Sequence, residues 1–245
     1  MARIDDLLAG VLAELPAKPE DDARQADKKA YSERVSKLLA LAFGEELRRR
    51  GMPEARPSPP GTLGDSGAER RIAGGIGAKK VDVTWATEEC GLILGISIKT
   101  INFRDAKTRN FQKNLTNRRA DMLMEAVTLH RRFPYAVLAG FFFLDKEAAS
   151  DGTDKRRSTL LNAHARLRLF TGRNDPAGRD EQYEKLYLVL LDSSGAAPPL
   201  QAWEVGKPGQ PVALDEIFTG LADLVAERNP DFYEALDGCL GRASA

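Results

Sequence analysis

Apolar residues recur every three or four positions in the first fifty residues. The first stripe consists of Ile4, Leu7, Leu8, Val11, Leu12 and Leu15. It predicts an amphipathic helix that ends at Pro16. A second stripe between Val35 and Leu47 predicts a longer helix over residues 28–50, which Gly51 can cap.

The middle of the chain changes to strand-like patterning after a proline-rich loop over residues 52–67. The predicted elements are a weak strand or strand-and-turn over 69–77, strands over 79–85 and 92–100, a helix over 111–132, and a strand over 135–144. The last of these is apolar throughout, which is typical of a buried central strand.

The remaining residues continue the same alternation of helices and strands. We expect a helix over 157–170, a strand over 186–191, an edge strand over 200–205, and helices over 214–228 and 231–240. This order predicts an α/β fold in which a mixed central sheet is flanked by helices. Residues 1–27 would form an N-terminal helical extension, 28–145 the core, and 146–245 additions that continue the same domain.

Composition narrows the functional classes only a little. The 245 residues include 36 Lys and Arg and 36 Asp and Glu, so the chain is formally neutral. Neutrality argues against a wholly basic nucleic-acid coat but permits a local basic cleft. Two cysteines and two histidines offer no zinc spacing. The cysteine pattern leaves a disulfide open but favours a reduced pair, and no signal or membrane-spanning pattern occurs, so we expect a cytoplasmic protein.

Two ionisable residues stand out because they interrupt apolar strands. Asp82 lies in Val81-Asp82-Val83, and Lys99 ends the run that begins at Leu92. Burying a charge is costly unless it is paired or binds a metal. A carboxylate and an ammonium at one sheet edge could hold a divalent metal and polarise a phosphate. The alternative interpretation is a structural salt bridge at a strand edge.

The order helix, three strands, helix, strand, with Asp82 on the second strand and Ser97-Ile98-Lys99 on the third, resembles the PD-(D/E)XK nuclease superfamily. The resemblance covers residues 28–144 and implies a restriction-endonuclease-like core (αβββαβ) with C-terminal additions. It implies a metal-binding role for Asp82, a catalytic role for Lys99 and a metal-binding carbonyl at Ile98. The implied cofactor is Mg²⁺, with Mn²⁺ as an alternative ion.

The sequence departs from the family pattern at Ser97, where an acidic residue is usual. Some members with serine there recruit a carboxylate from the following helix, and others use a glutamate of the first helix. Glu69, close before the glycine-rich turn, is a third source. The candidates are Glu33 and Glu69, ranked first, then Glu125, with Asp121 on the following helix and Glu46 on the first helix as further members. Ser97 shares a strand face with Lys99 and therefore belongs to the proposed catalytic group.

Basic and amide side chains surround the helix that follows the motif. Such residues bind phosphates and read base edges, so we expect contacts with DNA; the alternative is a solvated helix face. The candidates are Lys79, Lys80, Arg104, Asn110, Lys113, Asn114, Asn117 and Arg118. Asn110 is also a candidate helix cap. The Gly74–Gly77 segment could approach a phosphate or form a simple turn, and we expect His130 at a helix end and His164 on a helix surface.

The leading hypothesis is a metal-dependent DNA endonuclease of a restriction or phage-defence system. A second hypothesis is a catalytically degenerate nuclease fold that binds DNA or assembles a complex. A third is a junction resolvase or repair nuclease. Double-strand cleavage would favour a homodimer, and a protein of the same defence system is another expected partner.

Overall fold

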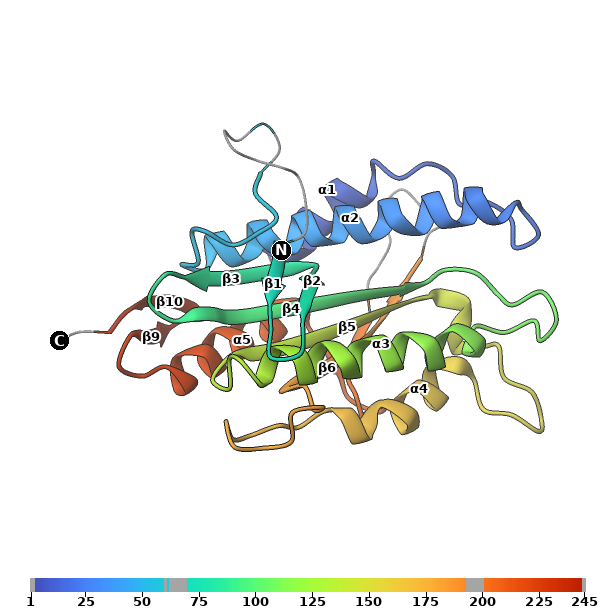
Figure 1. Cartoon of the computed structure of the whole chain (residues 1–245). Helices are drawn as coiled ribbons and strands as arrows, with labels where there is room; N and C mark the ends of the chain where they lie inside the picture. Colours follow the sequence, from blue (N-terminus) through green and yellow to red (C-terminus); the bar gives the residue numbers. More distant parts are fainter. Residues whose placement is uncertain (1–2, 60, 62–69, 193–200, 244–245) are drawn as a thin grey trace.

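One six-stranded mixed sheet forms the centre of the molecule (Figure 1). The computed structural model describes residues 3–59, 61, 70–192 and 201–243. The strands lie in the order β3 (Val83–Thr87), β4 (Gly91–Ile101), β5 (Val137–Asp145), β6 (Lys185–Leu191), β7 (Gln201–Glu204) and β8 (Pro211–Val212). The β4–β5 and β5–β6 pairs are parallel and the other three are antiparallel. The predicted mixed sheet flanked by helices is therefore confirmed.

Helices cover both faces of this sheet. The bounds of the helices are α1 (Arg3–Leu12), α2 (Gln25–Arg49), α3 (Gln112–His130), α4 (Thr159–Leu167) and α5 (Leu214–Arg228), with short 3₁₀ turns η1 (Lys146–Ala149) and η2 (Arg168–Phe170). One core cluster joins α1, α2 and α5 to one face, and a second joins α3 and α4 to the other. The fully buried β5 supplies both, since Phe141 and Phe143 face the first cluster and Phe142 the second.

Two hairpins lie outside the main sheet. The strands β1 (Arg70–Ala73) and β2 (Ala78–Val81) pair with each other, as do β9 (Tyr233–Leu236) and β10 (Cys239–Arg242). The second hairpin corrects the helix predicted over 231–240. Its two-residue loop holds Asp237 and Gly238 at φ 51° and 72°. Asp-Gly favours this geometry, a turn that reverses a strand.

Three further expectations are corrected. Residues 79–85 are not one strand, because the chain breaks at Asp82 between β2 and β3. Only two of the three strands expected before α3 therefore enter the main sheet. The strand near 200–205 is not at the edge, since β7 pairs with β6 and also with the short β8.

The remaining elements follow the sequence pattern closely. The long predicted helices appear as α2 and α3, and Gly51 adopts φ 88° just after α2. Both cysteines, Cys90 and Cys239, are free thiols. Across the described residues, no helix combines the length and apolar character needed to cross a membrane.

Candidate active site

A cleft of about 1020 Å³ opens where β4 extends beyond its partner β3. The β3–β4 pairing reaches Ile96, so the end of β4 continues past it. Side chains of α2, the end of β4, the loop after it and the start of α3 line this cleft. Eight lining residues are cationic and three are acidic, so the cleft carries an excess of five positive charges although the chain is neutral.

Asp82 and Lys99 lie together on the wall of this cleft. The backbone N–H of Ile98 donates to Asp82 Oδ2 at 2.6 Å. This bond holds the aspartate beside β4 at the point where β2 turns away. Lys99 Nζ lies 3.8 Å from the same oxygen. The two residues that the sequence singled out are therefore neighbours, as expected for adjacent strands.

Glu125 is the carboxylate that reaches Ser97. The Ser97 hydroxyl donates to Glu125 Oε1, and Lys99 Nζ lies 3.7 Å from Glu125 Oε2. Both Ser97 and Glu125 are buried. Tyr183, just before β6, lies behind them with its hydroxyl 3.4 Å from Ser97 Oγ and donating to the Met122 carbonyl. The Lys99 ammonium thus stands between two carboxylates that come from different elements.

Burial controls the protonation of this group. It raises the pKa of the Glu125 carboxyl above its ordinary value, while the Lys99 charge and the Ser97 hydrogen bond oppose that shift. Burial also raises the pKa of Tyr183 well above its ordinary value, and the Glu125 charge adds to this effect. Tyr183 therefore stays protonated and can act only as a neutral hydrogen-bonding group at physiological pH.

The oxygen donors here match a hard divalent cation. Within the described residues no group of three or more His, Cys, Asp and Glu side chains gathers as a metal cage. Mg²⁺ does not need one, because it is commonly bound by one or two carboxylates with water and substrate phosphate completing its octahedron. Asp82 and Glu125 supply two carboxylates, and Ile98 lines the same wall.

The other candidate carboxylates lie elsewhere. Glu33 is an exposed residue of the α2 cleft wall, 3.7 Å from Lys29. Glu46 is buried at the far end of α2 and bonded to Arg50. Asp121 is exposed. Glu69 lies outside the described residues.

The signal for Glu125 was present in the sequence. It stands three residues after Met122 and one before Ala126, both buried, so it interrupts the apolar stripe of α3. A carboxylate on the sheet-facing side of a helix must meet a partner from the sheet. Reading the stripe in this way would have ranked Glu125 above Glu33.

Five of the candidate DNA-binding residues line the cleft: Lys80, Arg104, Lys113, Asn117 and Arg118. Two of these cations also make ion pairs, Arg104 with Glu147 at 3.0 Å and Lys113 with Asp105 at 2.5 Å.

Two of the other candidates stand apart from the cleft wall. Asn110 is buried and accepts the N–H of Gln112 at 2.9 Å, which is a capping role at the start of α3. Lys79, next to Lys80 on β2, is partly exposed. The side chain of Asn114 lies outside the described residues.

The glycine-rich segment packs against α3. Gly75 N–H donates to the Thr128 carbonyl at 2.7 Å. A Cβ on Gly74 would lie 2.3 Å from that same oxygen, and one on Gly75 would lie 2.6 Å from Arg131 Cβ. The glycines therefore permit a close approach of the β1–β2 turn to the helix, which favours the simple-turn interpretation over phosphate binding.

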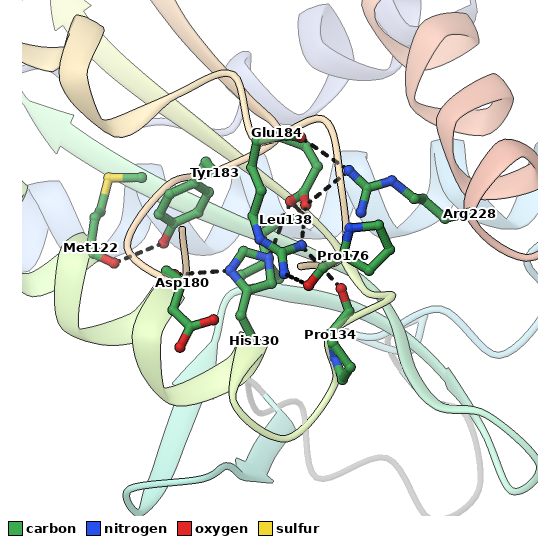
Figure 2. A network of polar contacts seen from close by, with 10 residues as sticks. Met122, His130, Pro134, Leu138, Pro176, Asp180, Tyr183, Glu184 and Arg228 are labelled. Atoms are coloured by element: carbon green, nitrogen blue, oxygen red, sulfur yellow. Dashed lines mark hydrogen bonds and ion pairs between the residues drawn. The ribbon is translucent and has the colours of Figure 1, made fainter. Parts of the chain in front are cut away.

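Both histidines are buried: His130 ends α3, as expected, whereas His164 does not lie on the helix surface, which corrects the expectation for that residue. His130 contacts Glu184 Oε2 at 3.3 Å and the Asp180 carbonyl at 3.0 Å (Figure 2). Glu184 also accepts from Arg173 at 2.9 Å and from the Leu138 N–H at 2.7 Å. His164 accepts the Gly206 N–H at 3.1 Å, and burial lowers its pKa.

We call the buried group His130, Arg173, Glu184 and Arg228 the Glu184 network. Arg228 lies at the end of α5, 3.6 Å from Glu184. Sequence patterning gave no signal for this network, because its members come from distant segments.

No protein-family model matches the chain, and no curated protein or solved structure does either. The functional argument therefore depends on the chemistry of the cleft.

Proposed function

We propose that this protein is a metal-dependent nuclease that hydrolyses phosphodiester bonds in DNA, as an endonuclease of a restriction or phage-defence system. The observation that carries the proposal is the convergence of Asp82, Lys99 and Glu125 beside a cleft with an excess of positive charge. A polyanion is attracted to such a cleft, and the three side chains offer the groups that hydrolysis needs.

We infer that α2, β3, β4, α3 and β5 form a core similar to that of restriction endonucleases. The support is the order of these elements and the positions of Asp82 before β3 and Lys99 near the end of β4. The main sheet differs from the expected pattern because the preceding strands form the separate β1–β2 hairpin.

Each residue has a defined part in this proposal. Asp82, Glu125 and the Ile98 carbonyl would hold Mg²⁺, which would supply Lewis-acid polarisation of the phosphate and activation of a water molecule. Lys99 orients the nucleophile and offsets charge that develops on the phosphate. Ser97 fixes the Glu125 carboxylate by donating to one of its oxygens, leaving the other directed at Lys99.

The test is cleavage of plasmid DNA by purified protein with Mg²⁺, Mn²⁺ or a chelator. We expect metal-dependent cutting that Asp82→Ala and Lys99→Ala each reduce by at least about 10²-fold, the usual cost of losing one electrostatic group at a reacting centre. Glu89→Gln should cut like the wild type because Glu89 is exposed, pairs with Arg242 and is not among the residues that line the cleft. Undiminished cutting by both alanine variants would refute the proposal.

A second candidate function is a DNA-binding subunit that has lost catalysis. The observation that favours it is Lys99, whose ammonium lies 3.8 Å from Asp82 Oδ2 and 3.7 Å from Glu125 Oε2, as it would in a purely structural ion-pair group. This alternative predicts DNA binding with no cleavage at any Mg²⁺ or Mn²⁺ concentration. Comparing linear duplex with a four-way junction would separate a restriction enzyme from a junction resolvase.

A further inference from the structure

The cleft has a second charged wall, which the sequence did not suggest. Nine residues of α2 line it, and their spacing places them on one face of the helix: Gln25, Lys28, Lys29, Ser32, Glu33, Ser36, Lys37, Ala40 and Leu41. At 1.5 Å per residue this stripe is about 24 Å long. It runs beside the end of β4, which carries Lys99.

The position of this wall is fixed by contacts on both sides of the helix. Ser36 Oγ lies 3.3 Å from Thr100 Oγ1, and Asn102 donates to Ser32 Oγ at 3.2 Å. The opposite face of α2 buries Val35, Leu39 and other core residues. The distance from the α2 stripe to Lys99 is therefore set by the fold.

Two exposed lysines of the stripe, Lys29 and Lys37, have the spacing of a phosphate backbone. They are eight residues apart, about 12 Å along the axis. One nucleic-acid strand carries a charge about every 3.4 Å, so the pair spans three to four phosphates. Among the residues that the structure describes, no carboxylate lies within 4 Å of Lys37, whereas Lys29 is 3.7 Å from Glu33.

Positive charge also lines the other side of the cleft. Lys80 of β2, and Lys113 and Arg118 of α3, share the cleft with the α2 lysines. Like charges that line one cleft repel each other unless an anion lies between them. Charge complementarity therefore favours a polyanion that contacts both sides at once.

We propose that the α2 stripe is a backbone-binding subsite, in which Lys29 and Lys37 contact phosphates of one strand that lie three to four positions apart, while Lys99 faces the scissile bond. This inference rests on the proposed nuclease function. It adds that α2 holds the DNA strand through phosphates and not through base edges. The contribution of α2 to binding affinity is therefore independent of the DNA sequence.

The test is the salt dependence of binding. A labelled 20-base-pair duplex and one of its strands alone are titrated with protein at several salt concentrations, without divalent cation so that the DNA stays intact. The double variant Lys29→Gln/Lys37→Gln should lower the slope of log K against log salt by about 1.8 for the duplex, or about 1.4 for the single strand. Loss of the expected slope in only one arm identifies the form of DNA that α2 holds, and loss in both arms shows that α2 holds either form.

The matched control removes two charges elsewhere. Lys185→Gln/Lys207→Gln alters lysines that contact Glu204, two or more strands away from β4. This variant should retain the wild-type slope.

Three results would overturn the inference. An unchanged slope in the α2 variant refutes the subsite while leaving the nuclease proposal intact, provided that the wild type cuts DNA. An equal loss in the control shows a general charge effect and refutes the subsite as well. Failure of the wild type to bind or cut either form of DNA refutes both the subsite and the nuclease.

Discussion

Two groups of charged residues, the Glu184 network and the cleft group of Asp82, Lys99 and Glu125, differ in how closely their ions pair and how exposed they are. In the Glu184 network, Arg173 donates to Glu184 at 2.9 Å and both side chains are fully buried. In the cleft, Lys99 stays 3.7 and 3.8 Å from its two carboxylates, and the side chains of Lys99 and Asp82 remain 16% and 17% exposed. The Glu184 network is therefore closed to solvent, whereas the group of Asp82, Lys99 and Glu125 is open to the cleft.

The difference indicates two kinds of role. Around Glu184, burial acts to raise the carboxyl pKa, but the His130, Leu138 and Arg173 hydrogen bonds outweigh it and the pKa is lowered. The ionised carboxylate is thus favoured and well satisfied. Around Glu125, burial dominates and the pKa is raised, so the ionised form of this carboxyl is disfavoured. The first behaviour is that of a structural ion-pair network, and the second is what the proposed metal site predicts for one of its carboxylates.

The largest expected effect is on the closed group. Glu184→Ala leaves the buried Arg173 and Arg228 without their carboxylate, and removing one partner of a buried pair costs about 3–5 kcal/mol. We expect a fall of that size in the free energy of unfolding, measured by urea denaturation. Glu181→Ala, which removes an exposed partner of Arg179, is the control and should change stability by less than about 1 kcal/mol. Equal losses in both variants would contradict the distinction.

Substitutions in the cleft group should lower the cleavage rate without lowering the free energy of unfolding. Glu125→Gln preserves the shape of the side chain but removes a proposed metal ligand, so we expect cleavage to fall about 10²–10³-fold. Its unfolding free energy should not decrease, because a charge that burial disfavours has been removed. Asp121→Asn, one helical turn earlier and exposed, should cut normally. A Glu125→Gln variant that cuts at the wild-type rate would exclude this residue from the site.

A smaller effect is expected at Ser97, which contacts a proposed ligand without being the main donor. Ser97→Ala removes the hydrogen bond to Glu125, and loss of such a supporting contact typically costs 10–100-fold in metal affinity or activity. We expect the Mg²⁺ concentration for half-maximal cleavage to rise by that factor, with the rate partly restored at high Mg²⁺. An unchanged Mg²⁺ titration would show that Ser97 only fills space.

The two groups also differ in how far the sequence predicted them. Asp82 and Lys99 could be found because each interrupts an apolar strand, and adjacent strands are close by construction. The interruption of the strand at Asp82, between β2 and β3, could not be predicted from the sequence. It depends on the Asp82 carboxylate accepting the Ile98 N–H in place of a backbone carbonyl. That contact exists only after β4 has been placed.

The Glu184 network was beyond a sequence-based prediction for a different reason. Its members span residues 130 to 228 and come from α3, α5 and the segment before β6. Local patterning reports which face of a helix is apolar, not which distant charges meet beneath it. His130 was expected only at a helix end, and the partner that explains its burial lies 54 residues further along the chain.

The smallest expected effect is on the pH dependence of the unfolding free energy, and it tests the same comparison between Glu184 and Glu125. The pKa of Glu184 is lowered in the folded protein, so as pH falls the unfolded chain takes up this proton first and unfolding becomes more favourable. The stability that Glu184 contributes is therefore present above its unfolded pKa, near 4.5, and is lost as pH falls through the lower folded value. We expect Glu184→Gln to flatten the decline of unfolding free energy between about pH 5 and pH 3, measured by urea denaturation at each pH. A variant whose decline matches the wild type would mean that Glu184 is not held as an anion, and the contrast with Glu125 would disappear.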